Sequence, residues 1–249
     1  SSFVPELVEG RMSEAIESSG IRKPMQFIFA NWKNALSVDE SVALARAARD
    51  IMAPAGVQLA LFPNAGAFAA VREAAGDSIV LGMQDVADPC DASGTYALVG
   101  HSDRRATADT DAIVARKLQA AADAGVIPVL CVGETKAERA AGTRDERIRA
   151  QVTSALTGAR VQKVFIAYEP VWAIGSGDAD KPEDTADAIR VIKETLAAVA
   201  PGIEASFLYG GSVNPQNVAS YMKLPDIAGV LVGKASITAS SIAALVAAL

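Results

Sequence analysis

The chain has 249 residues, of which 51% are hydrophobic and 21% charged, enough apolar material for one or two domains with a large core. Its net charge of -6 and pI near 4.9 argue against a nucleic acid or a membrane surface as partner, because neither polyanion attracts an acidic protein. Two cysteines make no disulfide framework, and no apolar run approaches the roughly 20 residues of a membrane span. We therefore expect a soluble, cytoplasmic protein.

The first 24 residues differ from the rest of the chain. Residues 1–24 have mixed charge and few apolar side chains, sufficient at most for one short helix at residues 12–18. We interpret residues 1–24 as an N-terminal extension and residues 25–249 as a single domain.

In that domain, short apolar runs alternate with amphipathic segments of helical period. Strands are predicted at residues 26–31, 57–62, 79–84, 96–100, 126–132, 163–168, 204–209 and 229–232. Helices are predicted from residue 38 onward after a capping box at Ser37 and Glu40, and at 65–75, 111–124, 143–156, 182–198, 215–223 and 240–248. Eight apolar strands alternating with helices predict a parallel sheet covered on its outer face. Closed on itself, this α/β architecture is a (β/α)8 barrel.

Polar side chains stand where several predicted strands end. Asn31 and Lys33 end the first strand, His101 follows the fourth, and Glu169 ends the sixth, so a barrel places them on one rim. Taken alone, such a Glu or His is more commonly structural, but their convergence favours catalysis. A carboxylate base with a neutral donor and a cation suits proton abstraction next to a carbonyl. His101 is the only histidine, which excludes a two-histidine metal site, and we expect neither metal nor cofactor.

Two glycine-containing turns predict an anion site. Gly210-Gly211-Ser212 and Gly233-Lys234 each follow a strand and precede a helix, so backbone N–H groups and helix dipoles can face a phosphate. Such turns are weak evidence alone, because glycine is common wherever the backbone needs freedom. Their position after the last two strands of a barrel, where phosphate sites recur, strengthens the prediction.

Four segments resemble the triosephosphate isomerase family in the same order. Residues 167–177, AYEPVWAIGSG, closely resemble its signature, which usually has Thr in place of Ser176. ANWK at 30–33, GHSDRR at 100–105, and YGGSVNPQN with GVLVGKAS between residues 209 and 236 also resemble family motifs. The resemblance covers nearly all of residues 25–249.

This resemblance implies an isomerase that interconverts dihydroxyacetone phosphate and glyceraldehyde 3-phosphate through an enediolate. It implies that Glu169 is the base, His101 the electrophile and Lys33 the cation, with Asn31 as its orienting neighbour. It also implies a hinged lid after Glu169, support from Ser102 and Asp103, and phosphate contacts from Gly175, Ser212, Gly233 and Lys234. The family is normally homodimeric.

Some positions depart from the family pattern. Asp103 replaces a Glu, so a shorter carboxylate must reach Lys33, and Lys234 replaces a glycine, where a positive φ would be strained. The far end of the lid reads Asp178-Ala179-Asp180 in place of Lys-Thr-Ala, two acids that we expect to slow closure or alter substrate size. An isomerase of a four-carbon tetrulose phosphate and a phosphate-binding paralogue without turnover therefore stay open as alternatives.

The third crossover is unusually short. Only residues 85–95 join two predicted strands, where a parallel crossover normally takes a dozen or more residues and a helix. Eleven residues span about 36 Å when extended, so the barrel can close without a helix. The family segment missing near Cys90 and Asp91 includes the tip that reaches the neighbouring subunit in relatives. We therefore expect a segment of the natural protein to be absent, in preference to a naturally short loop, and a monomer or weak dimer with an exposed apolar patch there.

Overall fold

The computed structural model describes residues 15–16, 22–23, 25–175 and 177–249. Eight parallel strands form a closed barrel in the order β10-β3-β4-β5-β6-β7-β8-β9. They are β3 (Gln26–Asn31), β4 (Val57–Phe62), β5 (Val80–Met83), β6 (Tyr96–Val99), β7 (Ile127–Val132), β8 (Lys163–Tyr168), β9 (Glu204–Tyr209) and β10 (Gly229–Val232). The (β/α)8 barrel is confirmed, and each strand lies within one residue of its predicted bounds.

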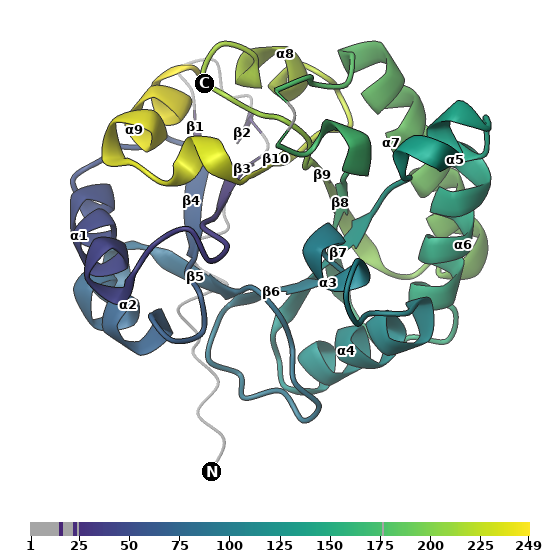
Figure 1. Cartoon of the computed structure of the whole chain (residues 1–249), viewed down its shortest axis with the longest axis horizontal. Coiled ribbons are helices and arrows are strands. Elements are labelled where there is room, and N and C mark those ends of the chain that lie inside the picture. The colour runs from purple at the N-terminus through teal and green to yellow at the C-terminus, as the bar shows by residue number, and fades with distance from the viewer. Residues whose placement is uncertain (1–14, 17–21, 24, 176) are drawn as a thin grey trace.

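Helices surround the barrel as an outer ring (Figure 1). They are α1 (Val38–Arg49), α2 (Phe68–Ala75), α3 (Ser102–Arg105), α4 (Asp111–Asp123), α5 (Lys136–Ala140), α6 (Arg144–Leu156), α7 (Pro182–Val199), α8 (Val218–Met222) and α9 (Ala239–Ala247), with 3-10 turns η2 (Gly76–Ser78), η3 (Val171–Ala173) and η4 (Lys234–Ser236). The predicted capping box is present, since Ser37 accepts from the Glu40 N–H and Glu40 accepts from the Ser37 N–H. The short helix α5 was not predicted from the sequence.

The strands are apolar on both faces because each face is buried in a different core layer. Inside the barrel, Phe29 contacts the rings of Phe62, Tyr96 and Phe165, with centroids 5.3, 4.7 and 5.1 Å away. Neighbouring residues such as Ile28 point outward into a larger cluster beneath the helices. The barrel is therefore a packed core, and a ligand can bind only at its ends.

The ring of helices is interrupted between β5 and β6, where the chain runs as an irregular connection (Figure 1). Residues 85–95, all of them described, include no helix or strand, as predicted. The prediction of an exposed apolar patch at this connection is wrong. The exposed large apolar side chains of the described residues are Val38, Met52 and Val171, and none of them lies in residues 85–95. The connection covers the strand end, because Ser93 donates to the Met83 sulfur at 3.1 Å and Met83 is only 8% exposed.

Short strands also occur in the N-terminal region. β1 (Ala15–Ile16) pairs antiparallel with β2 (Arg22–Lys23). Residues 15 and 16 therefore do not belong to the short helix that residues 12–18 could at most form, and the rest of that segment lies outside the described residues. Among the described helices, none is long and apolar enough to cross a membrane.

Candidate active site

Glu169 follows β8 and is 3% exposed. Its backbone N–H donates to the Val132 carbonyl at 2.7 Å, which continues the strand ladder into the loop. A Cβ at Gly133 would lie 1.9 Å from the Glu169 carbonyl oxygen, and a Cβ at Gly210 would lie 2.8 Å from its Cγ. Glycine is therefore required on both sides of Glu169, after β7 and after β9. The sequence analysis missed this requirement at Gly133.

The Glu169 carboxylate contacts two predicted site residues. Its Oε2 accepts a hydrogen bond from the Ser102 backbone N–H at 3.1 Å, and its Oε1 lies 3.3 Å from His101 Nε2. Burial, followed by the negative charge of Glu169, raises the pKa of the nearby Cys131 thiol, which keeps that thiol neutral. A buried carboxylate next to an imidazole therefore occupies the end of the barrel.

His101 is held as the N-cap of α3. Its Nδ1 accepts a hydrogen bond from the Asp103 backbone N–H at 3.2 Å, so we assign the proton of the neutral imidazole to Nε2. This proton faces Glu169, and Nε2 also lies 3.3 Å from Asn31 Nδ2. The ring can therefore donate a hydrogen bond into the space beside the carboxylate.

Lys33 adopts φ +50°, a left-handed conformation that is uncommon outside glycine. Its N–H donates to Asn31 Oδ1 at 3.0 Å, and its carbonyl accepts from Gln84 Nε2 at 2.8 Å. Its ammonium lies 3.0 Å from the Asp103 carboxylate, so the shorter acid does reach the lysine. Gln84 was not predicted, although it is a polar residue at the end of a strand on the same rim.

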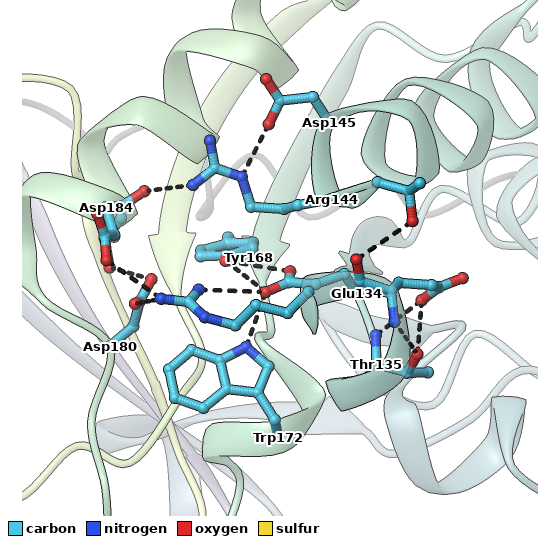
Figure 2. A network of polar contacts seen from close by, with 12 residues as sticks. Glu134, Thr135, Arg144, Asp145, Tyr168, Trp172, Asp180 and Asp184 are labelled. Atoms are coloured by element: carbon cyan, nitrogen blue, oxygen red, sulfur yellow. Dashed lines mark hydrogen bonds and ion pairs between the residues drawn. The ribbon is translucent and has the colours of Figure 1, made fainter. Parts of the chain in front are cut away.

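A second buried acid, Glu134, was also missed. It follows β7, and its fully buried carboxylate accepts hydrogen bonds from Trp172 Nε1 at 2.7 Å and the Tyr168 hydroxyl at 3.1 Å (Figure 2). Burial and then the charge of Glu134 raise the pKa of Tyr168, which keeps the phenol protonated as the donor. Glu134 follows a strand on the same rim as Glu169, so the argument that identified Glu169 from its place after a strand applies to Glu134 as well.

The predicted phosphate-binding residues lie at the same end of the barrel, and a Cβ at Gly233 would lie 3.7 Å from Lys33 Cε. η4 begins directly after Gly233, so its first N–H groups have no partner within the turn. Gly175 has φ +70°, whereas Lys234 does not have a positive φ, since Lys33 and Ala92 are the non-glycine cases among the described residues. The strain considered for Lys234 therefore does not arise.

One cavity of about 680 Å³ joins the two groups of residues. It is lined by eight of the ten predicted site residues: Asn31, Lys33, His101, Glu169, Gly175, Ser212, Gly233 and Lys234. Ser102 and Asp103 lie behind this lining and contact Glu169 and Lys33. A second cavity of about 360 Å³ adjoins the first at Asn31, Lys33 and His101.

The sequence was compared with protein families and with curated proteins. The family model for triosephosphate isomerase matches residues 90–249. A triosephosphate isomerase from Moorella thermoacetica is 38% identical over 247 residues, covering 91% of this chain and 98% of the relative. The chain belongs to the triosephosphate isomerase family.

Other relatives agree with this membership. A triosephosphate isomerase from Acidiphilium cryptum is 37% identical over 249 residues, covering 90% of this chain and 98% of the relative. One from Roseiflexus sp. is 45% identical over 154 residues, 59% of this chain and 61% of the relative. The match to the family model begins at Cys90, within the connection that has no helix. The match to the family model thus begins within the connection at which the regular repeat of the barrel is interrupted.

Proposed function

We propose that the protein interconverts dihydroxyacetone phosphate and glyceraldehyde 3-phosphate through an enediolate. The observation that carries this proposal is the single cavity in which Glu169, His101 and Lys33 face the glycine turns after β9 and β10. The substrate is proposed from the names of the relatives, which are triosephosphate isomerases. The residues that line the cavity include a carboxylate, an imidazole and an ammonium, the groups that this isomerisation needs.

Glu169 is the proposed base. Its Oε2 atom accepts a hydrogen bond from the Ser102 N–H at 3.1 Å. Substrate binding must therefore replace this hydrogen bond with a contact to the carbon-bound proton. Gly133 leaves space for the Glu169 carbonyl, and Gly210 leaves space for its side chain, because a Cβ at either position would lie too close to them.

His101 and Lys33 are the proposed stabilisers of the enediolate oxygens. The Nε2 proton of His101 faces the cavity, and the ammonium of Lys33 is fixed by Asp103 and by the backbone contacts to Asn31 and Gln84. Donors held in place before the reaction act on developing charge without reorganisation. Triosephosphate isomerase is itself a type case of a Glu base with a neutral His, so this pairing is carried over from the family.

The substrate phosphate is proposed to bind between Gly175, Ser212, Gly233 and Lys234. Free N–H groups at the start of η4 provide donors, and the exposed Lys234 adds a cation to an otherwise acidic protein. No metal or cofactor enters this scheme.

A four-carbon phosphate is a second candidate because of the smaller cavity. This cavity extends from Asn31, Lys33 and His101 to Phe68 and Met83. It gives space beyond the reacting end of a triose. Membership in a family of isomerases argues against the non-catalytic alternative.

One assay separates the two substrates. Purified protein is given glyceraldehyde 3-phosphate or a tetrulose phosphate, with the product followed by a coupled dehydrogenase. We expect the higher kcat/KM for the triose phosphate. Higher kcat/KM for the tetrulose phosphate would select the second candidate, and no turnover of either would overturn both.

A monomer or weak dimer is proposed as the assembly. The support is the connection between β5 and β6, which has no helix and lacks the family segment that the resemblance implies would reach a neighbouring subunit. Light scattering at sub-micromolar concentration should give the monomer mass, with an intact mass of 25.7 kDa. A tight dimer of chains of that mass would contradict the proposal.

A further inference from the structure

The short helix α5 lies beside both ends of the lid. The near hinge (residues 170–172) precedes the lid tip, and the far hinge (residues 178–180) leads into α7. Arg139 of α5 contacts both: its guanidinium carbon lies 4.1 Å from the centroid of the Trp172 ring, and its Nη2 lies 3.4 Å from Asp180 Oδ1. One side chain therefore joins two points that are eight residues apart in the chain.

The near hinge is held through the ring of Trp172. Glu134 accepts the indole N–H at 2.7 Å, while Arg139 stacks over the ring face and reaches Glu134 at 3.6 Å. A cation over an indole ring is the strongest of the common cation–π geometries. Any displacement of Arg139 therefore changes the environment of Trp172.

The far hinge is held in two different ways. The Asp180 N–H donates to the Tyr209 hydroxyl at 2.9 Å, and the Tyr221 hydroxyl donates to the Asp180 carbonyl. These backbone contacts are available to any residue, alanine included. The carboxylate is 1% exposed, accepts a long hydrogen bond from Thr185 Oγ1 at 3.4 Å, and forms an ion pair with Arg139.

The buried carboxylate is costly to the fold. Burial raises the pKa of Asp180; Arg139 from α5 and the Lys181 N–H oppose this effect, while Asp184 from α7 and Glu134 after β7 add to it. Tyr209 and Tyr221, which face its backbone, stay neutral because burial raises the pKa of each. Since the folded-state pKa lies above the unfolded one, the stabilising contribution of Asp180 is present at low pH and is lost as pH rises through the folded value. A neutral asparagine should therefore not destabilise the protein at neutral pH.

We propose that Asp180 and Arg139 are positioning residues that couple the two hinges of the lid, so that the far hinge and Trp172 change conformation together. The proposal rests on the proposed function, because a coupled lid has a task only if Glu169 reacts beneath it. Neither residue touches the reacting atoms: both act through the lid backbone and Trp172.

The first test observes Trp172 directly and needs no turnover. The chain has two tryptophans, so protein labelled with 5-fluorotryptophan gives two ¹⁹F resonances, assigned with Trp172→Phe. We expect Asp180→Asn to shift the Trp172 resonance, and acidification to shift it in the wild type and not in Asp180→Asn. An unmoved resonance in Asp180→Asn would overturn the coupling.

Asp184→Asn is the matched control. Asp184 lies 3.2 Å from the same Arg139 Nη2, but its side chain is 40% exposed and belongs to α7 beyond the hinge. Because solvent screens this pair, we expect a clearly smaller shift of the Trp172 resonance. In an Arg139→Gln background, Asp180→Asn should cause no further shift, and additive shifts would contradict the proposal.

Turnover supplies the second test. Asp180→Asn should lower kcat/KM by about fivefold, the lower end of coupling between sites, while the thermal unfolding midpoint does not fall. A merely structural role predicts the reverse, a lower midpoint with unchanged kcat/KM, and that result would overturn the inference. If the wild-type protein turns over no sugar phosphate, the proposed function fails, and the fluorine experiment still decides the coupling.

Discussion

The side of the barrel formed by β8 and β9 is more regular than the side formed by β5 and β6. β8 and β9 pair in register from Lys163 and Glu204 to Tyr168 and Tyr209, and the helix α7 crosses between them. β5 and β6 pair from Gly82 and Tyr96 to Met83 and Ala97, and an irregular connection replaces the crossover helix. Both sides nevertheless contribute to the same cavity.

This difference teaches what the site requires. The barrel stays closed because the interior aromatic cluster and the strand ladders do not involve the missing helix. The rim residues come from strand ends, so they keep their places as long as the strands do. Gln84 connects the two sides, since it directly follows β5 and donates a hydrogen bond to the carbonyl of Lys33. Changing the proposed base on the complete side should therefore have the largest effect on the chemistry, and changing a supporting residue on the interrupted side should weaken it less.

The largest effect is expected for Glu169→Asp on the complete side. A carboxylate drawn back by about 1 Å loses its alignment with the transition state, so kcat should fall by between about 10² and 10⁴-fold with little change in KM. Steady-state kinetics with glyceraldehyde 3-phosphate measure this. Glu73→Asp, at an exposed position on α2, is the control. An unchanged kcat in Glu169→Asp would falsify the assignment of the base.

His101→Gln should have the next largest effect. Losing one positioned donor to the enediolate costs about 10² to 10³-fold in kcat. His101 also caps α3 and lies after β6, so the unfolding midpoint is measured alongside kinetics. Wild-type turnover in this variant would remove His101 from the mechanism.

Gln84→Ala tests the link between the two sides. Its amide donates to the Lys33 and Phe62 carbonyls, each at 2.8 Å, and the lost contact to Lys33 should lower kcat/KM about fivefold, the equivalent of about 1 kcal/mol. Gln58→Ala is the matched control, because that amide accepts from the Tyr96 hydroxyl near the start of β4. Equal losses in both variants would show a general effect on folding, and the link to Lys33 would be wrong.

The smallest effect is expected for Lys234→Gly. An exposed ammonium contributes about 0 to 1 kcal/mol, so the inhibition constant for inorganic phosphate should rise by at most about fivefold. Lys223→Gly removes the same charge from an exposed lysine that does not line the cavity. Identical constants for Lys234→Gly and the wild type would mean that this side chain does not approach the phosphate.

The sequence by itself determined the strand positions and much of the site. Apolar runs mark the eight strands because each is buried on both faces. Since strand ends in a barrel share a rim, the sequence also predicted that Glu169, His101 and Lys33 lie together, and they line one cavity. The eleven residues at 85–95 also determined that no crossover helix forms.

Only the tertiary structure decided contacts between segments far apart in the chain. The reach of Asp103 to Lys33, the cover over Met83, and the joining of Trp172 to Asp180 by Arg139 depend on side-chain distances that no local pattern contains. α5 was missed because five residues are too few for a helical period to show. The hydrophobic period of a segment indicates which of its faces is buried. Which residues contact that face depends on how the strands and helices pack.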